Sequence, residues 1–539
     1  MTGVARPLFG RLLKSAPGAF YYFLLLVLIP WIIASRIYNL EAAPPGLFFD
    51  ESSIGYNAIR IMETGYDEHG KHYPVYFESV GDYKNPVFIY AVAFVFKLLG
   101  ASEFNLRLTS ALFFGFALLF SVLLIRKIFD GNRILTIYAL IGFGFTPLFF
   151  VLSRVAFEVI TQWTLVSAAT LTIWAAFHGR NAEKGLLFPA IVSGGLLGLS
   201  TYSYTTQRLL SSLMLVVLWA VYINRNNFKK LLALSFAYLI ALIPFLVFSF
   251  NNPGIVAERF LELSYVDDPL SFSEKASIFF GNYGVYWSPD FLIFHGDPNL
   301  RHSTGYGGVL FVVTIVLFVL GFLHLLLKKR RERFPVFLLV NLTISPIAAA
   351  LVTEGAPHAL RSMLVVYYIL LISCYGLAIV IDSRWHHVLK TALLTCLFLA
   401  HALESARYQR DYFVSYPARS VEDFGSFDLR SAIEFSLEHR PDEISAIGLP
   451  PGGYANIQFY SGNVENPAGI PIAVDDFREP KPGLCLIFHR RTDIESKLDA
   501  YSLPYDNFSS RKKLSPMERR FSVEKFNGVI KVRCYEREN

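Results

Sequence analysis

Long apolar segments with few charged residues dominate the first 400 residues of this chain. An apolar run of about 18–20 residues is long enough to cross a bilayer as a helix. Such runs lie at 19–38, 108–125, 134–152, 161–177, 186–201, 208–223, 231–250, 307–327, 334–352, 361–381 and 388–402. This pattern predicts a polytopic α-helical membrane protein with about eleven transmembrane helices. The first run is longer than the core of a signal peptide and lacks a small-residue cleavage site, so we expect a retained helix.

A twelfth apolar segment, 86–99, is treated differently because it is short and contains Lys97. If it crossed the membrane, the basic pair Arg126-Lys127 would lie on the opposite side from the other basic loops. Short loops rich in lysine and arginine normally face the cytoplasm. We therefore expect 86–99 to dip into or lie along the outer face, with the N-terminus cytoplasmic. The loops 39–107 and 251–306 and the chain after residue 402 are then external.

The sequence after the last apolar run has the mixed composition of a small α/β domain. We divide the chain into a transmembrane domain, 1–402, and an extracytoplasmic domain, 403–539, whose first residues, 403–425, are interpreted as a linker. Segments 446–449 and 484–488 predict strands, and 426–437 and 493–498 predict helices. Asn527-Gly528 within 521–536 is typical of a β-hairpin. Cys485 and Cys534 could form a disulfide, which the sequence alone leaves open.

Composition and charge agree with a membrane protein. The chain is 53% hydrophobic, with a mean hydropathy of +0.42. Its net charge of +6 arises from short loops between the apolar runs. Because no basic patch is separate from these loops, we expect contact with membrane lipid and none with nucleic acid. Four cysteines are too few for a disulfide framework.

The acidic pair Asp50-Glu51 is the leading candidate for chemistry. It follows the turn-forming Pro44-Pro45-Gly46 and precedes a helix-like stretch at 52–62. The positive end of a helix dipole favours an ionised carboxylate. These positions predict a catalytic carboxylate at a membrane surface, and the alternative is that Asp50 is only a helix N-cap.

Several basic residues and a second acid are expected on the same external face. Lys84 directly precedes an apolar segment, where it could hold a lipid phosphate or extend to the interface as an ordinary lysine. Arg107, Arg154 and Glu158 stand close to the bilayer, where ionisable residues are costly and often functional. Arg154 and Glu158, spaced i,i+4, could instead pair with each other.

Two external turns add further candidates. Arg301 and His302 belong to the run 295–303, whose spacing matches no standard zinc pattern, so a metal is not favoured. His358 and Arg361, in the turn 353–361, suit a phosphate or a diphosphate, or are simply positive residues at the interface. Tyr204, with its neighbours Tyr202 and Arg208, could stack on a sugar or belong to an interfacial aromatic belt.

In their order along the chain these motifs resemble the GT-C superfamily of integral-membrane glycosyltransferases. The similarity is greatest to the protein O-mannosyltransferase branch and to its bacterial cousins, including the aminoarabinose-lipid A transferase. It covers roughly residues 19–380. The matching features are Asp50-Glu51 after the first span, Lys84-Asn85-Pro86 before an apolar helix, Arg107-Leu108 and Glu158. This chain has Asn85 where the family usually has the first of two prolines, and Glu158 where the family has aspartate.

The resemblance implies a transferase of a bacterial envelope that uses a polyprenyl-phosphate-linked sugar. Asp50 would be the general base of an inverting transfer, with Glu51 and Glu158 as further acids of the site. The donor phosphate would be held by basic residues, and three residues would support the site. The phosphate-binding candidates are Lys84, Arg301, His302, His358 and Arg361, and the supporting candidates are Arg107, Arg154 and Tyr204. The resemblance implies no required cofactor, and the acceptor is a protein, a lipid or a polysaccharide.

Two other functions remain open at this level. A transporter or flippase of lipid-linked glycans should carry ionisable residues at mid-membrane depth and broken helices in paired halves. A glycan polymerase should have a long basic external loop. The charges here gather on one face, and the loop 251–306 has five acidic residues in its first half. We therefore expect a multi-pass glycosyltransferase of the inner or plasma membrane.

Overall fold

The computed structural model describes residues 18–178, 185–424, 429–439, 441–447, 453–463, 470–475, 483–489, 521–526 and 530–535. The chain divides into two compact units. The first comprises residues 1–40, 85–88 and 107–416, and the second comprises 41–84, 89–106 and 417–539. The predicted division at residues 402 and 403 stays a prediction, and the two units are described in turn.

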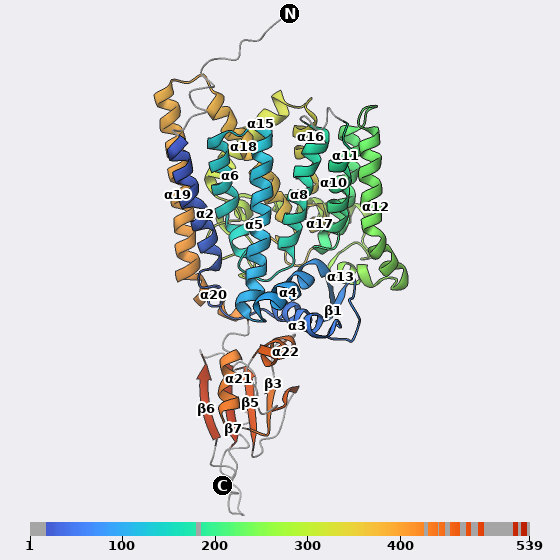
Figure 1. The fold of residues 1–539 in the computed structure, drawn as a ribbon, viewed down its shortest axis with the longest axis vertical. Coiled ribbons are helices and arrows are strands. Elements are labelled where there is room, and N and C mark those ends of the chain that lie inside the picture. Colours follow the sequence, from blue (N-terminus) through green and yellow to red (C-terminus); the bar gives the residue numbers. More distant parts are fainter. Residues whose placement is uncertain are drawn as a thin grey trace, which may run out of the picture. The chain divides into compact units, whose positions relative to one another are not determined.

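The first unit is a bundle of apolar helices (Figure 1). Within the described residues, eight helices are long and apolar enough to cross a membrane. They are α2 (Gly18–Ile37), α5 (Glu103–Ile128), α8 (Val159–Phe177), α11 (Thr205–Tyr222), α12 (Phe228–Asn251), the pair α16–α17 (Arg333–Ile344 and Ile347–Ala350), α18 (Met363–Asp382) and α19 (His387–Val414). The predicted polytopic helical fold is confirmed.

The three other predicted spans are shorter helices. They are α6 (Arg133–Phe145), α10 (Phe188–Ser200) and α15 (Val312–Lys328). Helix α6 ends early because a proline such as Pro147 cannot continue a helix from the preceding turn. Pro147 instead begins a new helix, α7 (Pro147–Leu152). The segment 86–99 forms α4 (Pro86–Leu99), whose 14 residues extend about 21 Å. That length is below the roughly 30 Å of a bilayer core, in keeping with the prediction that this segment does not cross.

Glycines allow two pairs of helices in the bundle to approach closely. A Cβ built on Gly194 of α10 would lie 2.0 Å from the Leu234 carbonyl oxygen of α12. A Cβ on Gly376 of α18 would lie 1.9 Å from the Leu317 carbonyl oxygen of α15. Side chains larger than hydrogen cannot fit at either position, a packing mode common among membrane helices. Helix α18 is closely packed on all sides, because 89% of its most apolar 18 residues are buried.

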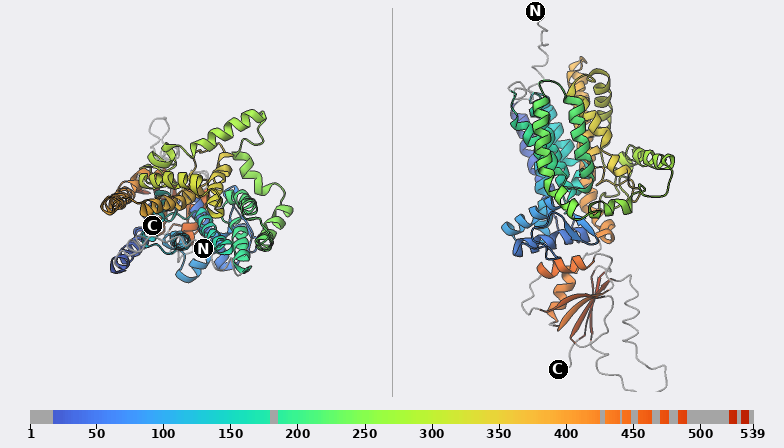
Figure 2. Two further views of the ribbon diagram at one scale, coloured as in Figure 1. Left: turned by 90° about the horizontal axis from the view of Figure 1, so that it is seen from above. Right: turned by 90° about the vertical axis from the view of Figure 1, so that its right-hand side faces the viewer.

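The long loop after α12 contains α13 (Ile255–Leu263), α14 (Phe272–Val285) and the short π-helix η1 (Asp290–Phe294). Neither α13 nor α14 has a buried residue, and Figure 2 shows both standing out from the side of the bundle. Ser271 caps α14 through its hydroxyl and Glu274. The loop is therefore largely helical.

The second unit contains α3 (Phe49–Thr64), the hairpin β1 (Phe77–Ser79) and β2 (Asp82–Lys84), and most of α4. Its C-terminal part has α20 (Tyr416–Phe424), α21 (Leu429–Glu438), α22 (Gly453–Asn463) and a five-stranded sheet of order β4-β3-β5-β7-β6. The strands are β3 (Glu443–Ile447), β4 (Ile472–Asp475), β5 (Leu484–His489), β6 (Phe521–Phe526) and β7 (Ile530–Tyr535). Parallel pairing joins β3 to β4 and β5, while β5, β7 and β6 pair antiparallel.

The sequence predicted part of this C-terminal domain. The expected strands and the β6–β7 hairpin are present, and Cys485 of β5 lies opposite Cys534 of β7 and is bonded to it. The predicted helix at 493–498 lies outside the described residues. The expected linker at 403–425 is helical instead, since α19 continues to Val414 and α20 follows. Its charged residues suggested a loop, although they equally suit a helix that continues beyond the apolar span.

Candidate functional site

Asp50 and Lys84 form an ion pair within the second unit. The Lys84 Nζ donates to the Asp50 Oδ1 at 2.5 Å. Asp50 stands in the first turn of α3, and Lys84 ends β2. The Asp50 side chain is 30% exposed, whereas that of Lys84 is 12% exposed. A solvent-accessible carboxylate is therefore held beside a largely shielded ammonium at the positive end of a helix.

The two neighbouring acids have different surroundings. Glu51 is fully buried, and its Oε2 accepts the backbone N–H of Phe48, the N-cap residue of α3, at 3.1 Å. This bond satisfies one of the amides that a helix start leaves without an intrahelical partner. Glu51 therefore stabilises α3, while Asp50 reaches solvent. A catalytic role for either carboxylate stays a prediction.

Glu158 lies in a polar cluster of the first unit, immediately before α8. Its Oε2 accepts the backbone N–H of Asn85 at 2.8 Å, and its Oε1 accepts the Asn85 side-chain amide at 2.6 Å. Arg208, at the start of α11, donates to the Asn85 Oδ1 at 3.2 Å. Asn85 thus donates from its backbone N–H and from its side-chain amide to one carboxylate. Its position next to Lys84 was noted in the sequence, but its contact with Glu158 was not foreseen.

Arg107 and Arg154 are both fully buried, and both bind backbone carbonyls in the last turn of α2 or just after it. Arg154 donates to the carbonyls of Ser35, Arg36, Tyr38 and Asn39 at 2.8–3.2 Å. Arg107 donates to the Leu40 carbonyl at 3.0 Å. The last carbonyls of a helix lack intrahelical partners and attract cations. Both arginines therefore anchor the end of α2.

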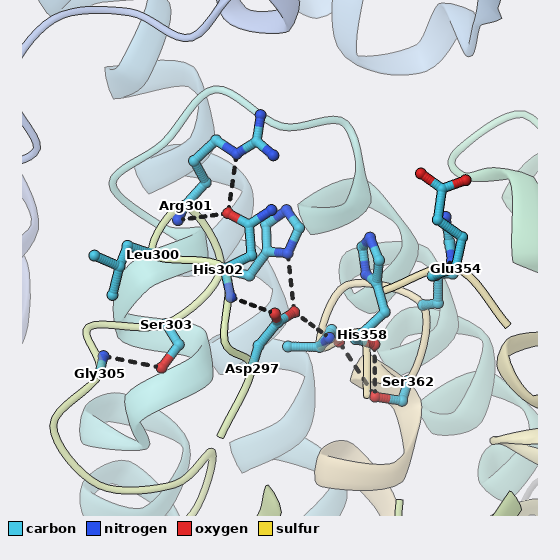
Figure 3. Close-up of polar contacts among 12 residues, drawn as sticks. Asp297, Leu300, Arg301, His302, Ser303, Gly305, Glu354, His358 and Ser362 are labelled. Carbon is cyan, nitrogen blue, oxygen red and sulfur yellow. Dashed lines mark hydrogen bonds and ion pairs between the residues drawn. The ribbon is translucent and has the colours of Figure 1, made fainter. Parts of the chain in front are cut away.

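Asp297, His302 and His358 form a second cluster in the first unit (Figure 3). The buried Asp297 Oδ2 bonds the His302 Nδ1 at 2.9 Å and accepts the Ala359 N–H at 2.8 Å. The other oxygen, Oδ1, accepts the Asn299 N–H at 2.8 Å. Asp297 therefore ties the run 295–303 to the turn 353–361. The ring centroids of His302 and His358 are 4.6 Å apart.

The donor atoms of Asp297, His302 and His358 lie within 4.8 Å of one another, so these side chains are the candidates for a metal ion. Burial, followed by the charges of His302, Arg361 and Arg301, lowers the pKa of His358 well below its usual range. Two arginines, Arg301 and Arg361, and two carboxylates, Asp297 and Glu354, therefore stand around the histidines (Figure 3). Arginine side chains bind phosphate through charge-assisted hydrogen bonds. The cluster thus has donors for a phosphate as well as candidate ligands for a metal.

The structure brings four of the predicted phosphate-binding residues together in this cluster. Arg301, whose Nε donates to Asn299 Oδ1 at 3.0 Å, and Arg361, which donates to the Glu354 carbonyl at 2.8 Å, flank the two histidines. The Nδ1 of His358 is shielded from solvent and has no hydrogen-bond partner in the described part of the chain. Such an atom is costly unless a ligand or water satisfies it.

The Glu158 and His302 clusters are close to each other in the first unit. The ring of Phe157, which directly precedes Glu158, meets the His302 ring edge to face with centroids 6.1 Å apart. Tyr204 directly precedes α11, and its supporting role stays a prediction. Its neighbour Tyr202 has a structural contact, because its hydroxyl bonds the Ala241 carbonyl and the Phe245 N–H in α12.

Comparisons with known proteins give a family match and a fold. Residues 83–250 match a family model described as dolichyl-phosphate-mannose-protein mannosyltransferase. No curated protein matches the chain. The structure is similar to that of ArnT from Cupriavidus metallidurans bound to undecaprenyl phosphate, with a TM-score of 0.57 and 13% identity over 96% of this chain and 98% of ArnT. The apo form of ArnT gives the same TM-score at 11% identity.

The oligosaccharyltransferase AglB from Archaeoglobus fulgidus, in complex with an inhibitory peptide and a dolichol-phosphate, is also similar. Its TM-score is 0.48 at 14% identity, over 89% of this chain and 71% of AglB. The family match spans part of the chain, and the ArnT fold spans nearly all of it. Both findings agree with the resemblance to the GT-C integral-membrane glycosyltransferases: residues 83–250 match the mannosyltransferase family model, and the multi-pass helical fold is that of ArnT.

Proposed function

We propose that the protein transfers a sugar from a polyprenyl-phosphate donor to an acceptor hydroxyl on the external membrane face, with inversion and with Asp50 as general base. The observation that carries this proposal is the Asp50–Lys84 pair, in which the carboxylate is 30% exposed. A carboxylate that reaches solvent can accept the proton of an acceptor hydroxyl. The family match over residues 83–250 and the undecaprenyl phosphate bound by the similar ArnT support a lipid-phosphate donor.

In the proposed reaction the acceptor oxygen bonds the anomeric carbon as the bond from that carbon to the phosphate oxygen breaks. The acceptor proton moves to the Asp50 carboxylate, and the polyprenyl phosphate leaves with its electron pair. A departing phosphate is stabilised by cations. The Lys84 ammonium bonds the Asp50 carboxylate. A donor phosphate would compete for the ammonium and leave the carboxylate available to the acceptor.

The cluster of Arg301, His302, His358 and Arg361 is the second proposed phosphate-binding element. Its support is the pair of arginines beside the histidines and the unpartnered Nδ1 of His358. The step described above uses protein side chains alone, and the prediction that no cofactor is required is retained. Transfer that survives chelation of divalent cations is the expected result.

For the topology, we propose a cytoplasmic N-terminus and an external C-terminal domain. The basic loops support this orientation. The disulfide between Cys485 and Cys534 also supports it, because disulfides persist in oxidising compartments outside the cytoplasm. A cysteine placed at Ala101 should react with an impermeant maleimide from outside the cell, and one placed at Lys329 should not. Labelling of both from the cytoplasm would overturn this topology.

The transfer itself is tested with radiolabelled polyprenyl-phosphate sugars and an envelope extract, comparing the wild type with Asp50→Asn. Loss of one general base should lower the rate about 10²–10⁴-fold. Glu63→Gln is the matched control, because Glu63 is an exposed carboxylate at the far end of the same helix. Near-normal transfer by Asp50→Asn would exclude this residue as the base. Absence of transfer with any monophosphate donor would favour a diphosphate donor, a polymerase or a flippase.

A further inference from the structure

Helix α22 of the C-terminal domain packs directly against α3, the helix that carries Asp50 (Figure 1). Phe459 of α22 is fully buried. A Cβ built on Gly55, in the middle of α3, would lie 2.5 Å from Cε2 of the Phe459 ring. Glycine weakens a helix interior relative to alanine. Its presence at position 55 is explained by the ring that lies against it.

The same helix contacts the hairpin that ends in Lys84. The Tyr454 hydroxyl accepts the backbone N–H of Val80 at 2.8 Å. Val80 and Gly81 form the two-residue turn between β1 and β2, with φ angles of 53° and 70°. Two positive φ angles match the turn type that suits a tight hairpin, but a β-branched residue is strained there. The bond to Tyr454 stabilises a turn that valine alone disfavours.

A third contact reaches the start of α3. The side-chain amide of Asn456 donates to the Leu47 carbonyl at 3.4 Å, in a buried setting. Leu47 immediately precedes Phe48, the N-cap residue of α3. Residues of α22 therefore touch the beginning and the middle of the Asp50 helix and the turn of the Lys84 hairpin. All of these contacts lie within the second unit.

We propose that α22 positions both members of the Asp50–Lys84 pair, so that the C-terminal domain is a required support of the reaction and not an appendage. This inference rests on the proposed role of Asp50. The ion pair joins two separate elements, a helix and a hairpin, and α22 is bonded to each of them. Displacement of α22 would therefore change the position of the carboxylate relative to the ammonium.

The consequence should be visible in kcat. A shift of about 1 Å in a reacting group can lower a rate about 10²-fold. Residues such as Tyr454 and Phe459 act through α3 and the hairpin, so they are positioning residues. Their substitution should lower kcat while leaving the KM for the acceptor unchanged, since none of them is proposed to touch the acceptor.

The experiment uses the full-length protein in membranes and four variants: Tyr454→Phe, Gly55→Ala, Phe459→Leu and the double variant Gly55→Ala with Phe459→Leu. Gly115→Ala in α5 is the matched control, because a Cβ there meets nothing within 4 Å. We expect kcat to fall about tenfold or more in Gly55→Ala. The smaller leucine should recover most of that loss in the double variant. Hydrogen exchange of the Val80 amide should be faster in Tyr454→Phe, with the folded fraction unchanged.

The possible results separate this inference from the proposed function. If Asp50→Asn abolishes transfer while Gly55→Ala and Tyr454→Phe keep the wild-type kcat, the positioning role of α22 is excluded and the base stands. If Asp50→Asn is active, the base assignment fails and this inference fails with it. A raised acceptor KM with unchanged kcat would make α22 part of an acceptor site and would overturn the positioning role. A reduced kcat in Gly55→Ala, restored in the double variant, would support it.

Discussion

We expect the replacement of Asn85 by proline to be damaging in this chain. Asn85 donates its backbone N–H and its side-chain amide to the two oxygens of Glu158, at 2.8 and 2.6 Å. Proline has no backbone N–H and no amide side chain. Asn85→Pro therefore removes both bonds to Glu158, whereas Asn85→Ala removes only the side-chain bond to it. Both variants also lose the bond from Arg208 to the Asn85 Oδ1 at 3.2 Å, so this loss does not distinguish them.

The size of the effect follows from the charge of the acceptor. A hydrogen bond to a charged group contributes about 1.5–3 kcal/mol. Asn85→Ala should therefore cost about 1.5–3 kcal/mol and Asn85→Pro about 3–6 kcal/mol, counting these two bonds alone. The larger value approaches the whole stability of an ordinary domain. We expect the proline variant to lose the local structure around Glu158.

Thermal unfolding of the purified variants measures this difference. The Glu158→Gln background provides the control, because the bonds to a charged acceptor are absent there and both substitutions at Asn85 should cost less. The reasoning would be refuted if Asn85→Pro were no more damaging than Asn85→Ala. It would also be refuted if the cost of either variant were the same in both backgrounds.

Three further predictions concern single groups. Lys84→Met should raise the KM for the donor about tenfold or more and leave the acceptor KM unchanged. The control Lys71→Met, which breaks an exposed pair with Glu78, should change neither KM. Burial is the main cause that lowers the pKa of His358 in the folded protein. The free energy of unfolding should therefore be greatest above the pKa of the unfolded histidine, about 6.5, and should fall as the pH drops below it. The unfolding temperature of His358→Asn should depend less on pH over that range. Replacing both Cys485 and Cys534 with serine removes a crosslink over 49 residues, which should cost the C-terminal domain about 4 kcal/mol, measured by denaturant unfolding.

The helical bundle was the most predictable part of the molecule, for a physical reason. A membrane-spanning helix requires a long uninterrupted apolar run, so its signal is strong in a single sequence. Helix boundaries were less certain where proline or glycine interrupts a run, as Pro147 does between α6 and α7. In the C-terminal domain the hairpin was found from Asn527-Gly528, but α22 was missed. Its sequence, GYANIQFYSGN, has no clear helical period, and its burial depends on α3.

The candidate site was predictable in its residue types but not in its partners. Asp50 and Lys84 are 34 positions apart, and nothing local in the sequence indicates that they meet. Asn85 was noted only as a departure from the family pattern, although its two donors explain why proline is absent there. Asp297 stood in the run 295–303 with its histidines and arginine, but its bond to the Ala359 amide of a distant turn could not be predicted from spacing. Tertiary contacts of this kind depend on how loops close, which spacing along the chain does not determine.

The buried arginines show why depth in the membrane is a weak guide to chemistry. Arg107 and Arg154 were selected because ionisable residues near a bilayer are costly and often functional. The structure places Arg154 on carbonyls at the end of α2, where the helix supplies compensating negative charge, and Arg107 on the Leu40 carbonyl just beyond it. Asp50 differs, because its carboxylate is partly open to solvent and held by a lysine that a phosphate could attract away. In the reaction that we propose, exposure and an exchangeable partner, more than burial, would distinguish the Asp50 carboxylate from these two arginines.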